Sequence, residues 1–127
     1  MVLNSDWKAQ LLKETKILFV DDDPTLRWLV RKAFLNMYQF SFASTLQIAR
    51  DVYDLWHPDI IFLDLSLPDG CGFDVMEEIL EENPAAQVVI ISNNSSPENI
   101  HKARMHGAKG FLLKPFSKEK MLEFLPV

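Results

Sequence analysis

Short apolar runs alternate with longer amphipathic segments along this chain of 127 residues. The apolar runs are continuous, a pattern typical of parallel strands that are covered on both faces. The segments between the runs repeat apolar residues at helical spacing, for example from Leu26 to Met37. The pattern therefore predicts a strand–helix unit repeated five times, with strands at residues 17–20, 40–43, 60–63, 88–91 and 111–113.

Capping and turn residues predict where the helices begin and end. Asp23 followed by Pro24 has the pattern of an N-cap and a first helical residue. Ser44 with Gln47 three positions later forms a capping-box pattern for the second helix. Residues 66–72 are rich in turn formers, so we expect a loop there. The other expected boundaries are a stop at His57-Pro58, a third helix over 73–82, a fourth capped by Ser96 and ending at Gly107, and a last helix capped by Ser117 and ending at Leu125.

Strands that alternate with helices favour an α/β fold with right-handed crossovers and helices on both faces of a parallel sheet. At this length we expect a flavodoxin-like (βα)5 arrangement, a doubly wound five-stranded parallel sheet with strand order 2-1-3-4-5. Residues 16–127 are expected to form this single domain. Residues 1–15 are expected to be an N-terminal extension, with a short amphipathic helix over Ser5–Lys16 that carries Trp7 and Leu11.

Composition excludes several classes of protein. Apolar residues make up 48% of the chain and charged residues 24%, as in an ordinary globular domain. No apolar run approaches the roughly 18 residues of a membrane span, and the first residues lack a signal-peptide pattern, so we expect a cytoplasmic protein without a membrane partner. The single cysteine, Cys71, excludes an internal disulfide. The net charge of −5 argues against direct binding to nucleic acid.

Polar residues with phosphoryl chemistry follow four of the predicted strands. Asp21 and Asp22 follow the first strand, Asp64 the third, Ser92 the fourth and Lys114 the fifth. The carboxyl ends of parallel strands share one edge, where ligands bind in such sheets, so these side chains should meet there. Crowded carboxylates repel one another, and Mg²⁺ with oxygen ligands would relieve the repulsion. Carboxylates, a hydroxyl, an ammonium and a metal together suit phosphoryl transfer.

With these residues in place, the chain resembles a response regulator receiver domain of two-component signalling, of the chemotaxis-regulator type, from Lys16 to about Leu125. Each matching segment is weak alone, but their order and their positions at strand ends are specific. The segments are residues 17–24 (ILFVDDDP), 58–70 (PDIIFLDLSLPDG), 89–92 (VIIS) and 107–116 (GAKGFLLKPF).

The resemblance implies a phosphorylation site with a bound metal. Asp64 matches the aspartate that takes a phosphoryl group from a phosphohistidine. Asp21 and Asp22 match the acidic pair that holds Mg²⁺, directly or through water. Ser66 lies where a backbone carbonyl completes the metal site, so the implied metal residues are Asp21, Asp22, Asp64 and Ser66.

The resemblance also implies a switch and partners. Lys114 matches the lysine that pairs with a phosphoryl oxygen, Ser92 the switch hydroxyl and Phe111 the switch aromatic residue. The implied donor is a sensor histidine kinase or a phosphotransfer protein. The implied downstream target is another protein or a fused output domain. A homodimer formed on phosphorylation is a further expectation. Such a domain is not a turnover enzyme.

Two other functions remain open at this stage. Asp21 and Asp23 fit the D-x-D motif of a haloacid dehalogenase-like phosphatase, with Asp21 as nucleophile and Asp23 as general acid. That scheme needs a further acidic pair, for which only Glu119 and Glu123 remain, and it gives Asp64 no role. The second alternative is a pseudo-receiver, which has the same fold but docks partners without phosphorylation.

Overall fold

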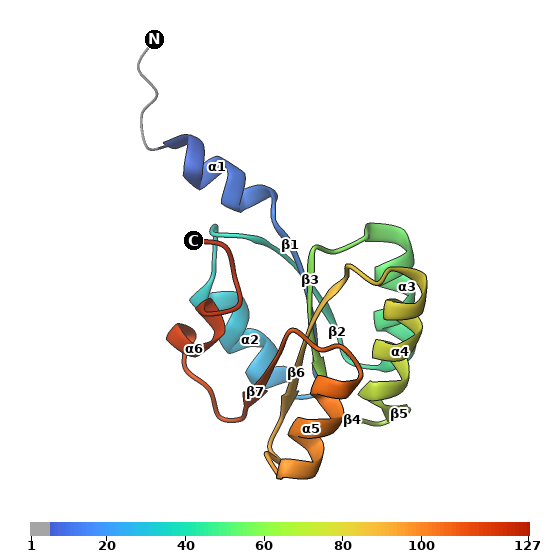
Figure 1. The fold of residues 1–127 in the computed structure, drawn as a ribbon. Helices are drawn as coiled ribbons and strands as arrows, with labels where there is room; N and C mark the ends of the chain where they lie inside the picture. Colours follow the sequence, from blue (N-terminus) through green and yellow to red (C-terminus); the bar gives the residue numbers. More distant parts are fainter. Residues whose placement is uncertain (1–5) are drawn as a thin grey trace.

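The computed structural model describes residues 6–127, which form a parallel five-stranded sheet flanked by helices (Figure 1). Every neighbouring pair of strands in this sheet is parallel. Its strand order is β2-β1-β3-β6-β7, which corresponds to the predicted order 2-1-3-4-5 and confirms the flavodoxin-like fold. The strands are β1 (Lys16–Val20), β2 (Gln39–Ala43), β3 (Ile60–Asp64), β6 (Gln87–Ser92) and β7 (Gly110–Leu113).

The helices lie on both faces of the sheet (Figure 1). One face is covered by α2 (Pro24–Ala33) and α6 (Lys118–Leu122), and the other by α3 (Leu46–Trp56), α4 (Gly72–Glu82) and α5 (Pro97–Met105). The first helix, α1 (Asp6–Glu14), precedes β1 and projects from the end of the sheet opposite to the carboxyl ends of the strands.

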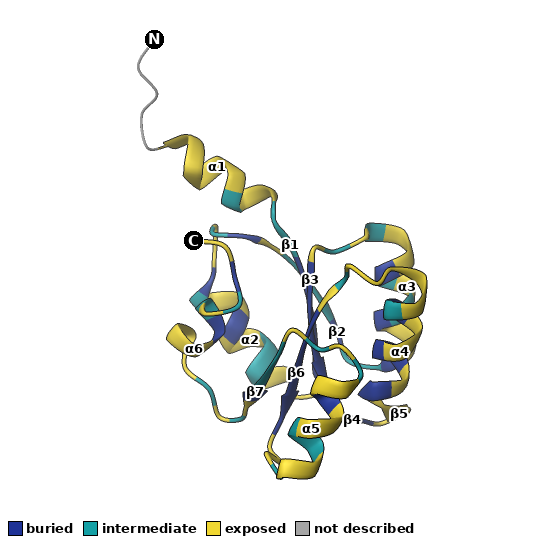
Figure 2. Cartoon of the chain, in the orientation of Figure 1, coloured by how far each residue is buried: buried dark blue, intermediate teal, exposed yellow. Residues whose placement is uncertain are grey.

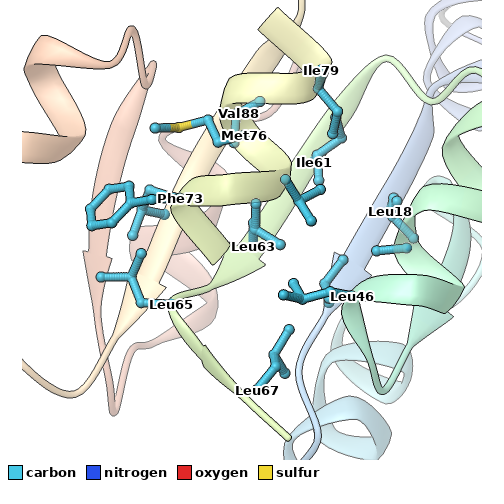
Figure 3. Close-up of a cluster of buried hydrophobic side chains, with 14 of the residues drawn as sticks. Leu18, Leu46, Ile61, Leu63, Leu65, Leu67, Phe73, Met76, Ile79 and Val88 are labelled. Carbon is cyan, nitrogen blue, oxygen red and sulfur yellow. The ribbon is translucent and has the colours of Figure 1, made fainter. Parts of the chain in front are cut away.

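Alternate residues of the central strands feed two separate cores, and Figure 2 shows these strands as the most buried part of the chain. In β1, Leu18 and Val20 pack beneath α3 and α4, whereas Ile17 and Phe19 pack against α2 and α6. Figure 3 shows the first of these cores, where side chains from the sheet meet residues such as Met76 of α4. Each fully buried side chain of this size contributes about 1.5–3 kcal/mol. The sheet is therefore a rigid base for whatever lies at its edge.

Helix caps follow the sequence pattern at three of four predicted positions. Side-chain oxygens of Asp23, Ser96 and Ser117 accept hydrogen bonds from the first turns of α2, α5 and α6. The prediction that Ser44 caps the second helix is wrong. Thr45 is the cap of α3, and Gln47 donates to Asp51 instead of reaching back to complete a capping box.

The other differences concern boundaries. Gly107 has φ of +93°, which no helix adopts, so α5 ends at Met105 rather than at Gly107. The last helix ends at Leu122, three residues earlier than expected. The predicted loop over 66–72 contains an antiparallel hairpin of β4 (Ser66–Leu67) and β5 (Gly70–Cys71).

The N-terminal helix is shorter than its predicted range. Its predicted start at Ser5 lies outside the described residues, and Lys16 belongs to β1. Over residues 6–127 no helix is long and apolar enough to cross a membrane.

Candidate functional site

Three carboxylates meet at the carboxyl ends of β1 and β3, which are neighbours in the sheet. One oxygen from each of Asp21, Asp22 and Asp64 lies within 4.8 Å of the others. Asp21 and Asp64 are buried, whereas Asp22 is exposed at the mouth of the group. The topology of the sheet thus brings together acids that are more than forty residues apart in the sequence.

Lys114, which follows β7, reaches the same carboxylates. Its Nζ lies 2.6 Å from Oδ2 of Asp64 and 2.5 Å from Oδ2 of Asp21. The Lys114 backbone amide also donates to the carbonyl of Ser92 at 2.8 Å, which fixes the start of the loop after β7. The Lys114-Pro115 peptide is cis. One ammonium is thus shared between two buried carboxylates.

Burial and charge pairing shift the pKa values of Asp64 and Lys114 in this pocket. Burial raises the pKa of the Asp64 carboxyl, and hydrogen bonds from Lys114 and from the Ser66 amide oppose this only in part. Burial lowers the pKa of the Lys114 ammonium, but pairing with Asp21 and Asp64 raises it by more, so its net shift is upward. A further cation beside Asp64 would favour its ionised form.

Asp21 has one carboxylate oxygen bound to the local backbone and one that faces the Lys114 ammonium. Oδ1 accepts a hydrogen bond from the Asp23 amide at 2.8 Å. Oδ2 is fully buried, and the Lys114 ammonium, 2.5 Å away, is its only partner among the described residues. A buried oxygen in this state suits a hard cation, and with Asp22 and Asp64 it gives the oxygen ligands that Mg²⁺ prefers. The residues present therefore fit the expected metal.

Arg27 also belongs to this site, although no motif in the sequence marked it as a site residue. Its Nη1 donates to the backbone carbonyl of Asp21 at 2.8 Å, across the first turn of α2. Arg27 lies four residues after the N-cap Asp23, so its side chain points back toward the start of the helix. The four-residue spacing from Asp23 is the feature of the sequence that could have indicated this contact.

Asp64 is held from the segment that follows it. Its Oδ1 accepts a hydrogen bond from the Ser66 amide at 3.1 Å. Further along, a Cβ atom added at Gly72 would lie 2.2 Å from the carbonyl oxygen of Asp64. Only glycine therefore allows α4 to begin so close to the end of β3.

The predicted switch hydroxyl, Ser92, forms no hydrogen bond with the three carboxylates in the described part of the chain. Ser92 is buried at the end of β6, and its Oγ accepts a hydrogen bond from the Asn94 amide at 3.0 Å. Phe111 is half-buried and packs against the core beneath α3, α4 and α5. It lines a groove of about 330 Å³ beside Ile100 and Ala103 of α5. Met105, the last residue of α5, is 70% exposed.

The phosphatase alternative loses its general acid in this geometry. The side chain of Asp23 accepts a hydrogen bond from the Thr25 amide and serves as the cap of α2. The phosphatase scheme would also need Glu119 and Glu123 as metal ligands. Glu119 lies in α6, Glu123 is the C-cap of that helix, and both are exposed.

Known proteins are similar to this chain in both sequence and fold. The chain is 32% identical over 107 residues to the transcriptional regulatory protein MalR of Bacillus subtilis, which covers 82% of this chain and 46% of MalR. It is 29% identical over 113 residues to the chemotaxis protein CheY of Listeria monocytogenes, which covers 87% of this chain and 94% of CheY. The chain thus spans about half of MalR and nearly all of this CheY.

Solved structures agree with this similarity. The non-phosphorylated receiver domain of HemR from Leptospira biflexa superposes with a TM-score of 0.81 at 28% identity, over 87% of this chain and 90% of that one. The BeF3-activated receiver domain of DrrB gives a TM-score of 0.78 at 27% identity, over 86% and 92%. The profile of the response regulator receiver domain matches residues 17–125. The chain therefore belongs to the response regulator receiver domain family of two-component signalling.

Proposed function

We propose that Asp64 accepts a phosphoryl group from a phosphohistidine of a sensor histidine kinase or phosphotransfer protein, in a reaction that requires Mg²⁺. The observation that carries this proposal is the position of Asp64, which is buried within reach of Asp21 and Asp22 and 2.6 Å from the Lys114 ammonium. Asp21 shares this arrangement, but its side chain is 0% exposed, whereas that of Asp64 is 7% exposed and therefore more accessible to a phosphoryl donor.

In the proposed step an Asp64 carboxylate oxygen attacks phosphorus, and the phosphorus–nitrogen bond to the donor histidine breaks. The electron pair of that bond stays on the imidazole nitrogen, and an acyl phosphate forms on Asp64. Lys114 pairs with a phosphoryl oxygen and balances the negative charge that the phosphoryl group brings into the pocket. The sheet edge supplies the fixed positions that phosphoryl transfer requires.

Asp21, Asp22 and Asp64 would hold the metal, together with the backbone carbonyl of Ser66 at the exposed mouth of the site. When bound, Mg²⁺ supplies positive charge that stabilises the transferring phosphoryl group. Arg27 keeps the end of β1 in place for this purpose through its hydrogen bond to Asp21.

We further propose that the acyl phosphate changes the surface of the domain through Ser92 and Phe111. The Ser92 hydroxyl can donate its proton to a phosphoryl oxygen, because in the structure it acts only as an acceptor, from Asn94. A shift of Ser92 would let Phe111 turn inward and alter the face formed by α5 and β7. The readers of that face would be a downstream protein or a fused output domain, and the domain would act as a cytoplasmic signal carrier rather than a turnover enzyme.

The test is labelling by a small acyl phosphate donor with and without Mg²⁺, followed by intact mass. We expect one phosphoryl group per chain, dependent on Mg²⁺ and absent in Asp64→Asn, which should stay folded by circular dichroism. Labelling retained in Asp64→Asn would refute the assignment. No label on the wild-type chain would favour a pseudo-receiver, and sustained turnover lost in Asp21→Asn or Asp23→Asn would favour a phosphatase.

A further inference from the structure

The hairpin that follows Asp64 has no strand partner in the main sheet. Its strands, β4 and β5, pair only with each other, through Ser66 with Cys71 and Leu67 with Gly70. A two-stranded ribbon this short is not stable by itself in water. Since the hairpin carries Ser66, something outside the main sheet must fix its position.

Asp69, at the turn of the hairpin, provides that attachment. Its Oδ1 accepts a hydrogen bond from the Leu46 amide at 2.8 Å, and its Oδ2 accepts one from the Gln47 amide at 3.1 Å. Both amides belong to the first turn of α3, where the helix dipole also favours an anion. The Leu46 hydrogen bond is the main cause that lowers the pKa of Asp69, so this carboxylate is charged at neutral pH.

Apolar contacts hold the hairpin against the same turn of α3. Leu67 of β4 is buried in the core that contains Leu46 (Figure 3). Gly70 lies so near that a Cβ atom there would be 3.2 Å from Cδ1 of Leu46. Apolar packing alone would allow the hairpin to slide along α3, and the hydrogen bonds of Asp69 add the direction that fixes its position.

We propose that Asp69 is a positioning residue for the metal and phosphoacceptor site, acting through the hairpin that it fastens to α3. The Ser66 amide donates to Oδ1 of Asp64, and the Ser66 carbonyl lies in the next peptide along β4. Release of Asp69 from α3 would loosen Ser66 and thereby both the Asp64 carboxylate and one metal ligand. This inference rests on the proposed function of the site.

Thr45 offers a matched control for a purely structural role of Asp69. Its Oγ1 accepts a hydrogen bond from the Ile48 amide at 3.1 Å, so it caps the same helix. Thr45 does not belong to the hairpin. Loss of either cap should destabilise α3, but only loss of Asp69 should disturb Ser66 and Asp64.

The experiment compares the wild-type full chain with Asp69→Ala, Asp69→Asn and Thr45→Ala at a temperature at which each is folded by circular dichroism. Titration calorimetry measures the Mg²⁺ dissociation constant, and amide hydrogen exchange follows the Ser66 N–H. We expect Asp69→Ala to weaken Mg²⁺ binding about tenfold, the low end for groups that support metal ligands, and to speed exchange at Ser66. Thr45→Ala should leave both unchanged.

Asp69→Asn keeps one acceptor oxygen but no charge, so its Mg²⁺ affinity should lie between those of wild type and Asp69→Ala. Equal affinities of the Asn and Ala variants would mean that charge alone acts, and equal effects of Asp69→Ala and Thr45→Ala would mean an ordinary cap. Either result overturns the inference. If Asp69→Ala does not fold, the comparison of Asp69→Asn with Thr45→Ala decides. Failure of the wild-type chain to bind Mg²⁺ or accept a phosphoryl group would refute the proposed function instead.

Discussion

Replacement of Lys114 by methionine tests how the site balances its charges. Methionine keeps most of the apolar stem of lysine and removes only the ammonium. That ammonium is the cation paired with Asp21 and Asp64, whose side chains are 0% and 7% exposed. Without the ammonium, two buried carboxylates lie next to each other with no cation to pair with, unless a metal ion binds between them.

The expected cost follows from this burial. Removal of one partner from a buried ion pair costs about 3–5 kcal/mol, because the other charge stays buried and unpaired. The Lys114 side chain is 22% exposed, so some water already screens the group. We therefore expect Lys114→Met to lower the free energy of unfolding by about 3 kcal/mol in a chelator.

Mg²⁺ should reduce that cost. The metal no longer competes with an ammonium for the same oxygens, so it should bind Lys114→Met at least as tightly as wild type. Each tenfold gain in affinity would recover about 1.4 kcal/mol of the deficit at saturating Mg²⁺. Phosphorylation should still fall, because the charge that pairs with the phosphoryl group is missing.

The assay is urea unfolding with chelator and with saturating Mg²⁺, together with titration calorimetry. Lys120→Met is the control, since Lys120 forms an exposed pair with Glu123 at 3.7 Å and its loss should cost less than about 1 kcal/mol. A deficit for Lys114→Met as small as that of the control would refute the reasoning. So would a collapse of Mg²⁺ affinity, because Lys114 would then support metal binding.

Three further changes test other parts of the site. Gly72→Ala forces a Cβ atom against the Asp64 carbonyl oxygen, so unfolding in urea should show a loss of about 1–3 kcal/mol and labelling should slow; an unchanged midpoint would contradict this contact. Arg27→Met removes the donor to the Asp21 carbonyl and should cost about 1.5 kcal/mol by thermal unfolding, with partial recovery in Arg27→Lys; equal stabilities of the two variants would argue against the hydrogen bond. The lowered pKa of Asp69 means that its stabilisation is present above the ordinary carboxyl pKa of about 3.9 and is lost as pH falls through the native value. The stability difference between wild type and Asp69→Asn should therefore shrink below about pH 4, and a constant difference would contradict the cap.

The sheet was predictable because its signals are local. Each apolar run such as residues 60–63 is marked by its own composition, and the parallel order follows from the alternation with helices. Convergence of Asp21 and Asp64 then required no knowledge of side-chain packing. It needed only the rule that parallel strands end at one edge.

The contacts that were missed join residues far apart in the sequence. Asp69 lies 23 residues from Leu46, and no pattern around either residue indicates that a turn caps a distant helix. The hairpin was also missed, because two-residue strands leave no periodicity to detect. The error at Ser44 is local instead, because Asp51, one helical turn after Gln47, competes with the helix start as a partner for the Gln47 side chain.

A shared local geometry explains why the site uses short polar side chains at three strand ends. One oxygen of Asp21, Asp64 and Ser92 accepts a hydrogen bond from the amide two residues later. This turn fixes each side chain as the strand ends, and it needs the short reach of Asp or Ser rather than Glu. The second oxygen of each carboxylate can then pair with Lys114 or a metal. Ser92 has a single oxygen, which already accepts a hydrogen bond, so its hydroxyl can contribute only as a donor. In the proposed phosphorylation, this geometry suits the aspartates to metal ligation and attack, and the serine to the detection of a new acceptor oxygen.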